Sequence, residues 1–186
     1  MAKGVRKPKS KLAGSVEMFA LFEANIHFGK SNLATLTGAR MIKFYANIVK
    51  DYSLMEVASK MLKEINRVAE NVENSEFFEI LDKSLSGLDA NYPFNLVEIW
   101  FVLNLKRAMG EQINLYTDVD GLKLEENKRY DWDGMEMAFL NSIDGAFDAD
   151  AIKVLRLIVS VDLAVVFRVK GVEKYMPEIL KIMKSW

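Results

Sequence analysis

Cysteine is absent from this chain of 186 residues, which also holds only one histidine, three prolines and ten glycines. Without cysteine there is no disulfide framework, no thiolate zinc site and no cysteine nucleophile. A single histidine cannot build a histidine metal cluster. The scarcity of proline and glycine disfavours a turn-rich all-β fold. These absences leave a protein that folds on its hydrophobic core alone.

The remaining composition is that of a folded chain, with 51% hydrophobic and 27% charged residues. Such a balance excludes an intrinsically disordered protein. The length suits one domain, or one domain with a small appendage, and should bury roughly 70% of the unfolded surface. The chain opens with charged residues rather than an apolar signal-peptide core, so we expect a soluble cytoplasmic protein.

Charge is distributed unevenly although the net charge is only −1. Residues 1–43 carry eight basic and two acidic side chains, whereas residues 44–186 carry 17 basic and 24 acidic ones. A basic start on an acidic body suggests that the start binds a polyanion. The alternative is a solvated basic terminus without a partner.

An alternating pattern follows the basic residues and predicts a β-strand from Val16 to Phe28. The segment 29–32 is a predicted turn, and residues 33–36 can return as a second strand. We therefore expect an antiparallel sheet in residues 1–40, with the remaining residues, 41–186, forming a mainly helical domain. The fold class is α+β.

Three amphipathic or apolar segments predict helices in the first half of the helical domain. The first begins at a capping box formed by Ser53 and Glu56. The second spans about 75–86, with Gly87 as its stop, and the third begins near Pro93 or Asn95 and ends before Gly110. The third has almost no polar face, so we expect it to be central.

The second half begins with a predicted hairpin insert at about 111–134, with Asp120-Gly121 as a turn. A short helix is expected over Met135–Leu140. A long buried helix is expected over Ala151–Val169, because its charged residues, Asp162 among them, argue against a membrane span. Pro177 fits the first turn of a last helix.

No catalytic constellation is visible, so we do not expect an enzyme, a cofactor or a metal site. The pairs Asp118/Asp120 and Asp131/Asp133 resemble the openings of calcium loops but lack the further ligands in register, and solvated turns explain them better. Paired carboxylates could in principle serve acid–base chemistry, but no pocket-forming context accompanies them. His27 is expected to be a surface residue.

The basic segment is the strongest candidate for a binding site. Five cations fall within nine residues and could follow the phosphates of a single strand while an aromatic ring stacks on a base. Phe19 and Leu21 lie on the polar face of the strand, where they either contact bases or pack against the helical body; packing is favoured. The predicted DNA-binding residues are Lys3, Arg6, Lys7, Lys9 and Lys11.

The first forty residues resemble the RecO family of bacterial recombination mediators. Residues 3–10 match the family's basic Lys-Gly-x-Arg-x-x-x-Ser segment in its N-terminal OB-fold, and Gly29-Lys30 matches a turn after the long strand. The helix that closes with Gly110 and the leucine-rich helix from Ala151 are similar to later family helices. Family members begin with further residues that supply the first strands of the barrel, so that here either the barrel is incomplete or the start is truncated, and the zinc-binding cysteines of the family are absent. We therefore expect a partial OB-like sheet.

The resemblance implies a DNA-binding mediator of recombination and repair. Such a protein binds single- and double-stranded DNA, anneals strands and, with RecR, assists the loading of RecA on DNA coated by single-stranded-DNA-binding protein. It also implies a bacterial, nucleoid-associated location and a groove for the acidic tail of the single-stranded-DNA-binding protein. Lys106 and Arg107 are the candidate contacts for that tail, or simply complement the dipole of a helix end. The alternative function is a helical protein–protein adaptor that does not bind DNA.

Overall fold

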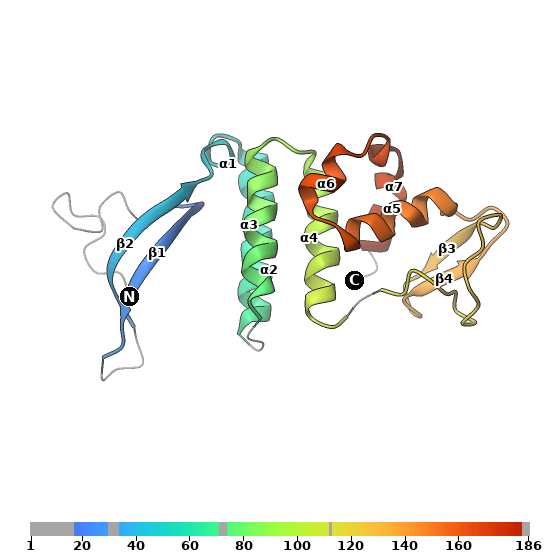
Figure 1. Ribbon diagram of the computed structural model, residues 1–186, viewed down its shortest axis with the longest axis horizontal. Coiled ribbons are helices and arrows are strands. Elements are labelled where there is room, and N and C mark those ends of the chain that lie inside the picture. The colour runs from blue at the N-terminus through green and yellow to red at the C-terminus, as the bar shows by residue number, and fades with distance from the viewer. Residues whose placement is uncertain (1–16, 30–33, 71–73, 112, 184–186) are drawn as a thin grey trace. The chain divides into compact units, whose positions relative to one another are not determined.

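The computed structural model describes residues 17–29, 34–70, 74–111 and 113–183 (Figure 1). The chain divides into two compact units, the first ending at Met55 and the second beginning at Glu56. The first contains an antiparallel pair of strands, and the second contains helices and a small hairpin. The predicted α+β class is therefore confirmed.

The first unit is built on strands β1 (Ala20–His27) and β2 (Thr35–Phe44), which pair from Ala20↔Phe44 to His27↔Thr35. The register shifts twice, so that β2 contributes one extra residue at each shift, Thr37 and Ile42. Such bulges bend a strand and strengthen its twist, as small barrels require. The ribbon is therefore curved rather than flat.

The boundaries of these strands differ from the sequence prediction. β1 begins at Ala20 rather than Val16, because Phe19 adopts a left-handed backbone conformation with φ 54°. The carbonyl of Phe19 accepts a hydrogen bond of 3.0 Å from Tyr45 N–H. β2 runs to Phe44, well beyond the predicted end at Leu36, and the boundary expected at residue 40 falls inside it.

Two helices follow, α1 (Ala46–Lys50) and α2 (Tyr52–Ala69). The predicted capping box at Ser53 is wrong, because Asp51 occupies the capping position. Asp51 Oδ1 accepts hydrogen bonds from Ser53 N–H at 2.8 Å and Leu54 N–H at 3.2 Å. A carboxylate at this position satisfies two otherwise unpaired amides of the first turn.

The core of the second unit surrounds the predicted central helix, α4 (Phe94–Ala108). It packs against α3 (Glu76–Asp89), α5 (Ala149–Ser160), α6 (Leu163–Arg168) and α7 (Met176–Met183). Eight of its fifteen residues are buried, which explains why its sequence lacks a polar face. Gly110 follows with φ 83°, the left-handed geometry that ends helices.

Gly87 was expected to end α3 but lies inside it, two residues before its last residue, Asp89. A Cβ atom at this position would lie 2.7 Å from Leu163 Cδ2 and 3.2 Å from Tyr92 Cδ2. The glycine therefore allows α6 to approach α3 closely, and it does not act as a stop signal.

The prediction of one long helix over Ala151–Val169 is also wrong, because α5 ends at Ser160 and a separate helix, α6, begins at Leu163. Asp148 caps α5 by accepting a hydrogen bond from Ala151 N–H, and Asp162 caps α6 through Ala164 N–H. The 3-10 helix η1 (Val172–Tyr175) precedes α7, where Pro177 occupies the first turn as expected. Among the described residues, no helix is long and apolar enough to cross a membrane.

The hairpin insert extends further than the predicted range, 111–134. Strands β3 (Tyr130–Asp133) and β4 (Ala138–Asn141) pair from Tyr130↔Asn141 to Asp133↔Ala138. The helix expected over Met135–Leu140 is therefore a turn followed by a strand. Its apolar residues pair with a neighbouring strand, a requirement that local sequence does not reveal. A bridge between Thr117 and Lys123 confirms the turn at Asp120-Gly121.

Candidate nucleic-acid and partner-binding sites

The basic segment with Lys3, Arg6, Lys7, Lys9 and Lys11 lies outside the described residues. Its assignment to DNA therefore stays a prediction. The structure does describe the strand that follows this segment.

The surface of β1 and β2 combines cations with exposed apolar side chains. Phe28, just after β1, is 79% exposed, and Ile26 is 53% exposed. Arg40 on β2 pairs with Glu23 on β1 at 2.8 Å, and Lys43 Nζ lies 4.8 Å from the centre of the Tyr45 ring. The ribbon therefore offers an accessible ring next to His27, whereas Arg40 and Lys43 lie further along it, opposite Glu23 and Leu21.

Phe19 is only 6% exposed, so it is buried and offers no surface for stacking on a base. Phe28 was not singled out by sequence reasoning, because alternation placed it on the apolar face of the strand. The exposed fraction of Phe28 makes it the better candidate for stacking. His27 is exposed, as expected.

Lys106 and Arg107, the predicted partner contacts, lie in the last turn of α4. Lys106 Nζ pairs with Glu111, and Arg107 Nη2 lies 3.6 Å from Glu76 Oε2. Both positions suit cations that complement the dipole of a helix end. Arg107 also lines a cavity.

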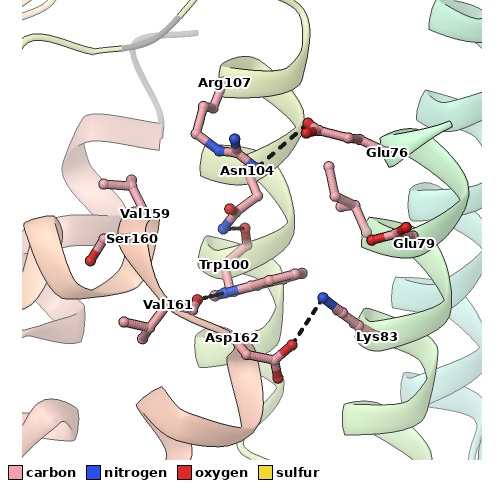
Figure 2. A pocket seen from close by; sticks show the side chains of 11 residues that line it. Glu76, Glu79, Lys83, Trp100, Asn104, Arg107, Val159, Ser160, Val161 and Asp162 are labelled. Atoms are coloured by element: carbon pink, nitrogen blue, oxygen red, sulfur yellow. Dashed lines mark hydrogen bonds and ion pairs between the residues drawn. The ribbon is translucent and has the colours of Figure 1, made fainter. Parts of the chain in front are cut away.

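This cavity lies between α3, α4 and the junction of α5 with α6, and we call it the α3–α4 cavity (Figure 2). Its volume is about 410 Å³. The lining residues are Glu76, Glu79, Ile80, Lys83, Trp100, Asn104, Arg107, Val159, Ser160, Val161 and Asp162. Trp100, Asn104 and Arg107 follow one another at helical spacing and form one wall.

Hydrogen bonds hold that wall in place. Trp100 Nε1 donates to the Val161 carbonyl at 3.0 Å, which fixes the indole against the helix break. Asn104 Nδ2 donates to the Trp100 and Ile158 carbonyls at 2.9 and 3.3 Å. Trp100 and Asn104 are only 3% and 4% exposed. The wall is therefore a preformed surface.

Charges around the cavity are mostly paired. Lys83 Nζ lies 3.0 Å from Asp162 Oδ2, and Arg107 faces Glu76. Burial raises the pKa of Asp162, but hydrogen bonds from Ala164 N–H and Lys83, together with the lysine charge, outweigh it and lower the pKa. The exposed side chain of Glu79 makes no hydrogen bond or ion pair with the described residues.

A second, mainly apolar cavity of about 270 Å³ lies between the start of α4, α6, η1 and α7. Leu96, Val166, Phe167, Val169 and Met176 are among its lining residues. Three exposed cations occur in the same stretch of chain. They are Arg168, Lys170 and Lys174.

The carboxylates of the hairpin insert stabilise turns. Asp118 Oδ1 accepts hydrogen bonds from Asp120 and Leu122 N–H, and Asp133 Oδ1 accepts from Met135 and Glu136 N–H. Asp131 Oδ1 accepts from Ala146 N–H at 2.9 Å, and this bond is the main reason that its pKa lies below the ordinary value. Asp118 and Asp133 are therefore turn residues, as expected, although Asp118 is buried rather than solvated, whereas Asp131 lies in β3 and holds the Ala146 backbone.

Together, these features define an α+β protein in which a bulged β-ribbon accompanies a helical unit with a hairpin insert and two surface cavities. No family model matches the chain. It is, however, 31% identical over 110 residues to the DNA repair protein RecO of Dehalococcoides mccartyi, and 30% identical over 112 residues to that of Heliobacterium modesticaldum. This similarity confirms the predicted resemblance to the RecO family.

The similarity covers 59% of this chain, and 43% and 40% of those two relatives. A second D. mccartyi strain provides a RecO that is also 31% identical over 110 residues. The chain thus matches about two-fifths of the length of the curated relatives.

Proposed function

We propose that this protein takes part in DNA repair and recombination by binding DNA, without catalysing bond chemistry. The observation that carries the proposal is the similarity to several curated RecO proteins, each named for DNA repair. The charge distribution supports it independently, because residues 1–43 carry a net charge of +6 on a chain whose net charge is −1.

In this proposal, Lys3, Arg6, Lys7, Lys9 and Lys11 follow the phosphates of a single strand. Phe28, exposed at the end of β1, stacks on a base. The bends in the ribbon support the expected OB-like character, because OB-folds bind oligonucleotides on curved strands. Strand annealing and RecA loading with RecR are the further activities that the resemblance implies.

A charge-neutralised variant tests the proposed DNA site. We expect Lys7→Gln/Lys9→Gln/Lys11→Gln to bind a fluorescently labelled single strand about a hundredfold more weakly at 0.1 M salt, since three phosphate contacts are lost. The matched control, Lys63→Gln/Lys170→Gln/Lys174→Gln, changes the net charge equally on the second unit and should bind normally. Equal losses in both variants would mean that binding depends only on overall charge.

Absence of DNA binding by the unmodified chain at low salt would overturn the proposal and leave the adaptor alternative. Fluorescence anisotropy measures both outcomes in one titration. The control variant also shows whether the helical unit contributes to DNA affinity.

We also propose that the apolar cavity between α4, α6 and α7 receives the acidic tail of the single-stranded-DNA-binding protein. Most of the lining is apolar, and three cations nearby in the chain, Arg168, Lys170 and Lys174, outweigh the one acidic lining residue, Glu173, in attracting acidic residues. Lys106 and Arg107 are less suited to this role, because each already pairs with a glutamate.

Two valines on neighbouring turns test this docking site. Val169 lines the apolar cavity and is 37% exposed, whereas Val165 is 46% exposed on α6 and does not line it. We expect Val169→Glu to abolish binding of an acidic tail peptide and Val165→Glu to leave it unchanged. If Val169→Glu binds the tail peptide as well as the parent does, the tail does not bind in this cavity.

A further inference from the structure

We propose that the outer edge of β1 pairs with the same edge of a second copy of this chain, forming a four-stranded antiparallel sheet across a twofold axis at Ala24. The inference begins from the pairing within the first unit: among the described residues, β1 pairs with β2 alone (Figure 1). It does not depend on the proposed DNA binding, because it concerns pairing between two copies of one strand.

The backbone hydrogen bonds show which groups of β1 face outward. The carbonyl of Asn25 accepts a hydrogen bond of 3.0 Å from the Thr37 hydroxyl on β2, so the backbone groups of Asn25 face β2. Backbone groups alternate between the two sides of a strand, and those of Phe22, Ala24 and Ile26 therefore face the outer edge. In the described part of the chain, no other strand lies there to pair with them.

The edge of β2 carries features that discourage pairing, whereas the edge of β1 does not. β2 contains two bulge residues, Thr37 and Ile42, and two cations, Arg40 and Lys43. Bulges and cations are the usual means by which proteins protect exposed edges. β1 contains no bulge residue, and its one Asp, Glu, Lys or Arg residue is Glu23. The edge of β1 is therefore the one suited to a further strand.

Side-chain alternation and charge together select the register of the proposed pair. Side chains that face each other must lie on the same face of the sheet, so the axis has to pass through a residue. Axes at Glu23 and Ala24 pair all but one of the eight residues of β1. The axis at Glu23 opposes two identical carboxylates, which is unfavourable. The axis at Ala24 places Glu23 opposite the amide of Asn25 from the second copy, which can donate hydrogen bonds to it.

The apolar face of the ribbon favours the same arrangement. Four apolar pairs share this face, and they are Ala20↔Phe44, Phe22↔Met41, Ala24↔Ala39 and Ile26↔Leu36. Ile26 is 53% exposed, and in the proposed sheet it lies opposite Phe22 of the second copy, an aromatic–β-branched pair of the kind that stabilises sheets. Two strands alone are marginally stable in water, whereas three or more with a hydrophobic face are not. A second copy suits the edge because β1 is complementary to itself, as twofold interfaces require.

The mass of the whole chain in solution is the first test. Light scattering after size exclusion should give about twice the chain mass of 21.2 kDa. The measurement is made at about 100 μM, because an interface limited to one strand edge is small and binds weakly. The mass should fall toward that of one chain on dilution.

A single introduced cysteine locates the axis, because the chain has no cysteine of its own. In Ala24→Cys the two facing Cα atoms would lie about 5.5 Å apart, a distance that permits a disulfide. After mild oxidation, we expect most of this variant to run as a linked dimer on a non-reducing gel.

Ala39→Cys is the matched control, because Ala39 pairs with Ala24 within the ribbon and lies on the same face. Its two copies would be three strand spacings apart, about 14 Å, and should remain unlinked. Three results would overturn the inference: the mass of a single chain at the higher concentration, no disulfide in Ala24→Cys, or equal linking of the two variants. Each would assign the edge of β1 to a different strand, and none bears on DNA affinity.

Discussion

Lys83 on α3 and Asp162 at the start of α6 form an ion pair of 3.0 Å that joins two helices separated by about eighty residues of chain. Asp162 also accepts a hydrogen bond from Ala164 N–H at 3.0 Å, so one carboxylate caps α6 and connects it to α3. Both residues line the α3–α4 cavity and also a separate hollow of about 270 Å³ that reaches Gly87, Ala90 and Tyr92. The two roles of Asp162, capping α6 and pairing with Lys83, can be separated by mutation.

Removing the cap should cost more than removing the ion pair. We expect Asp162→Ala to lower the free energy of unfolding by about 1–2 kcal/mol, because the first turn of α6 loses its acceptor. Lys83→Met should cost only about 0–1 kcal/mol, since both side chains are partly exposed and their attraction is screened. Urea unfolding measures both values. A larger loss in Lys83→Met would contradict this ranking.

Asp131 should make stability sensitive to acid. Its pKa is lowered from an ordinary value of 3.8, mainly by the Ala146 N–H bond and then by Ser142. A lowered pKa means that the folded state favours the carboxylate, so this stabilisation is present above pH 3.8 and is lost as the pH falls through the lower folded value.

The variant Asp131→Asn should therefore be less stable than the parent at pH 7 and lose less stability between pH 5 and the acid limit. Urea unfolding across this range provides the measurement. Asp133→Asn is the control, because it replaces a carboxylate of the same strand that accepts hydrogen bonds from Met135 and Glu136 N–H rather than from Ala146 N–H. Parallel pH profiles for Asp131→Asn and the parent would be inconsistent with this assignment.

Gly145 should not tolerate a side chain. A Cβ atom there would lie 2.5 Å from the carbonyl carbon and oxygen of Tyr130. The Tyr130 backbone is held by reciprocal hydrogen bonds with Phe147 of 2.9 and 2.8 Å, so it cannot shift freely. We expect Gly145→Ala to destabilise the chain by at least about 2 kcal/mol.

Gly29→Ala is the control for this substitution, because a Cβ at Gly29 meets nothing within 4 Å. Thermal or urea unfolding should detect little change in the control. Equal stability of the two variants would mean that the hairpin can open around Gly145.

Phe28 should contribute stacking to DNA affinity without contributing charge. Stacking on an aromatic ring is worth about 1–3 kcal/mol per base, so Phe28→Ala should weaken single-strand binding at least about fivefold. The dependence on salt should not change, because no phosphate contact is removed. Phe78→Ala removes a ring that is 55% exposed on α3 and should have no effect. Equal effects would argue against a stacking site at Phe28.

Local patterns in the sequence predicted several elements correctly. Alternation located most of β1, and the continuous apolar stretch after Pro93 identified α4 as central, because both patterns reflect burial of the element itself. The errors arose where distant contacts decide the structure. Met135–Leu140 becomes a turn and a strand because β4 pairs with β3.

The sequence did not reveal the break between α5 and α6, because the residues on both sides of it are mostly apolar. Asp162 was therefore interpreted as a charged residue within a single long helix. Its position just before Leu163 is the signal of a second N-cap. The α3–α4 cavity could not be predicted, apart from Arg107, because its lining comes from three separate segments. Only the packing of α3, α4 and the α5–α6 junction brings these segments together.

The salt dependence of DNA affinity tests the central claim most directly. If Lys3, Arg6, Lys7, Lys9 and Lys11 each neutralise one phosphate, log K should fall with log salt with a slope near −3.5, since each single-strand contact contributes about −0.7. Raising salt from 50 to 200 mM should then weaken binding about a hundredfold. A flat response, or no binding at the lower salt concentration, would contradict the account.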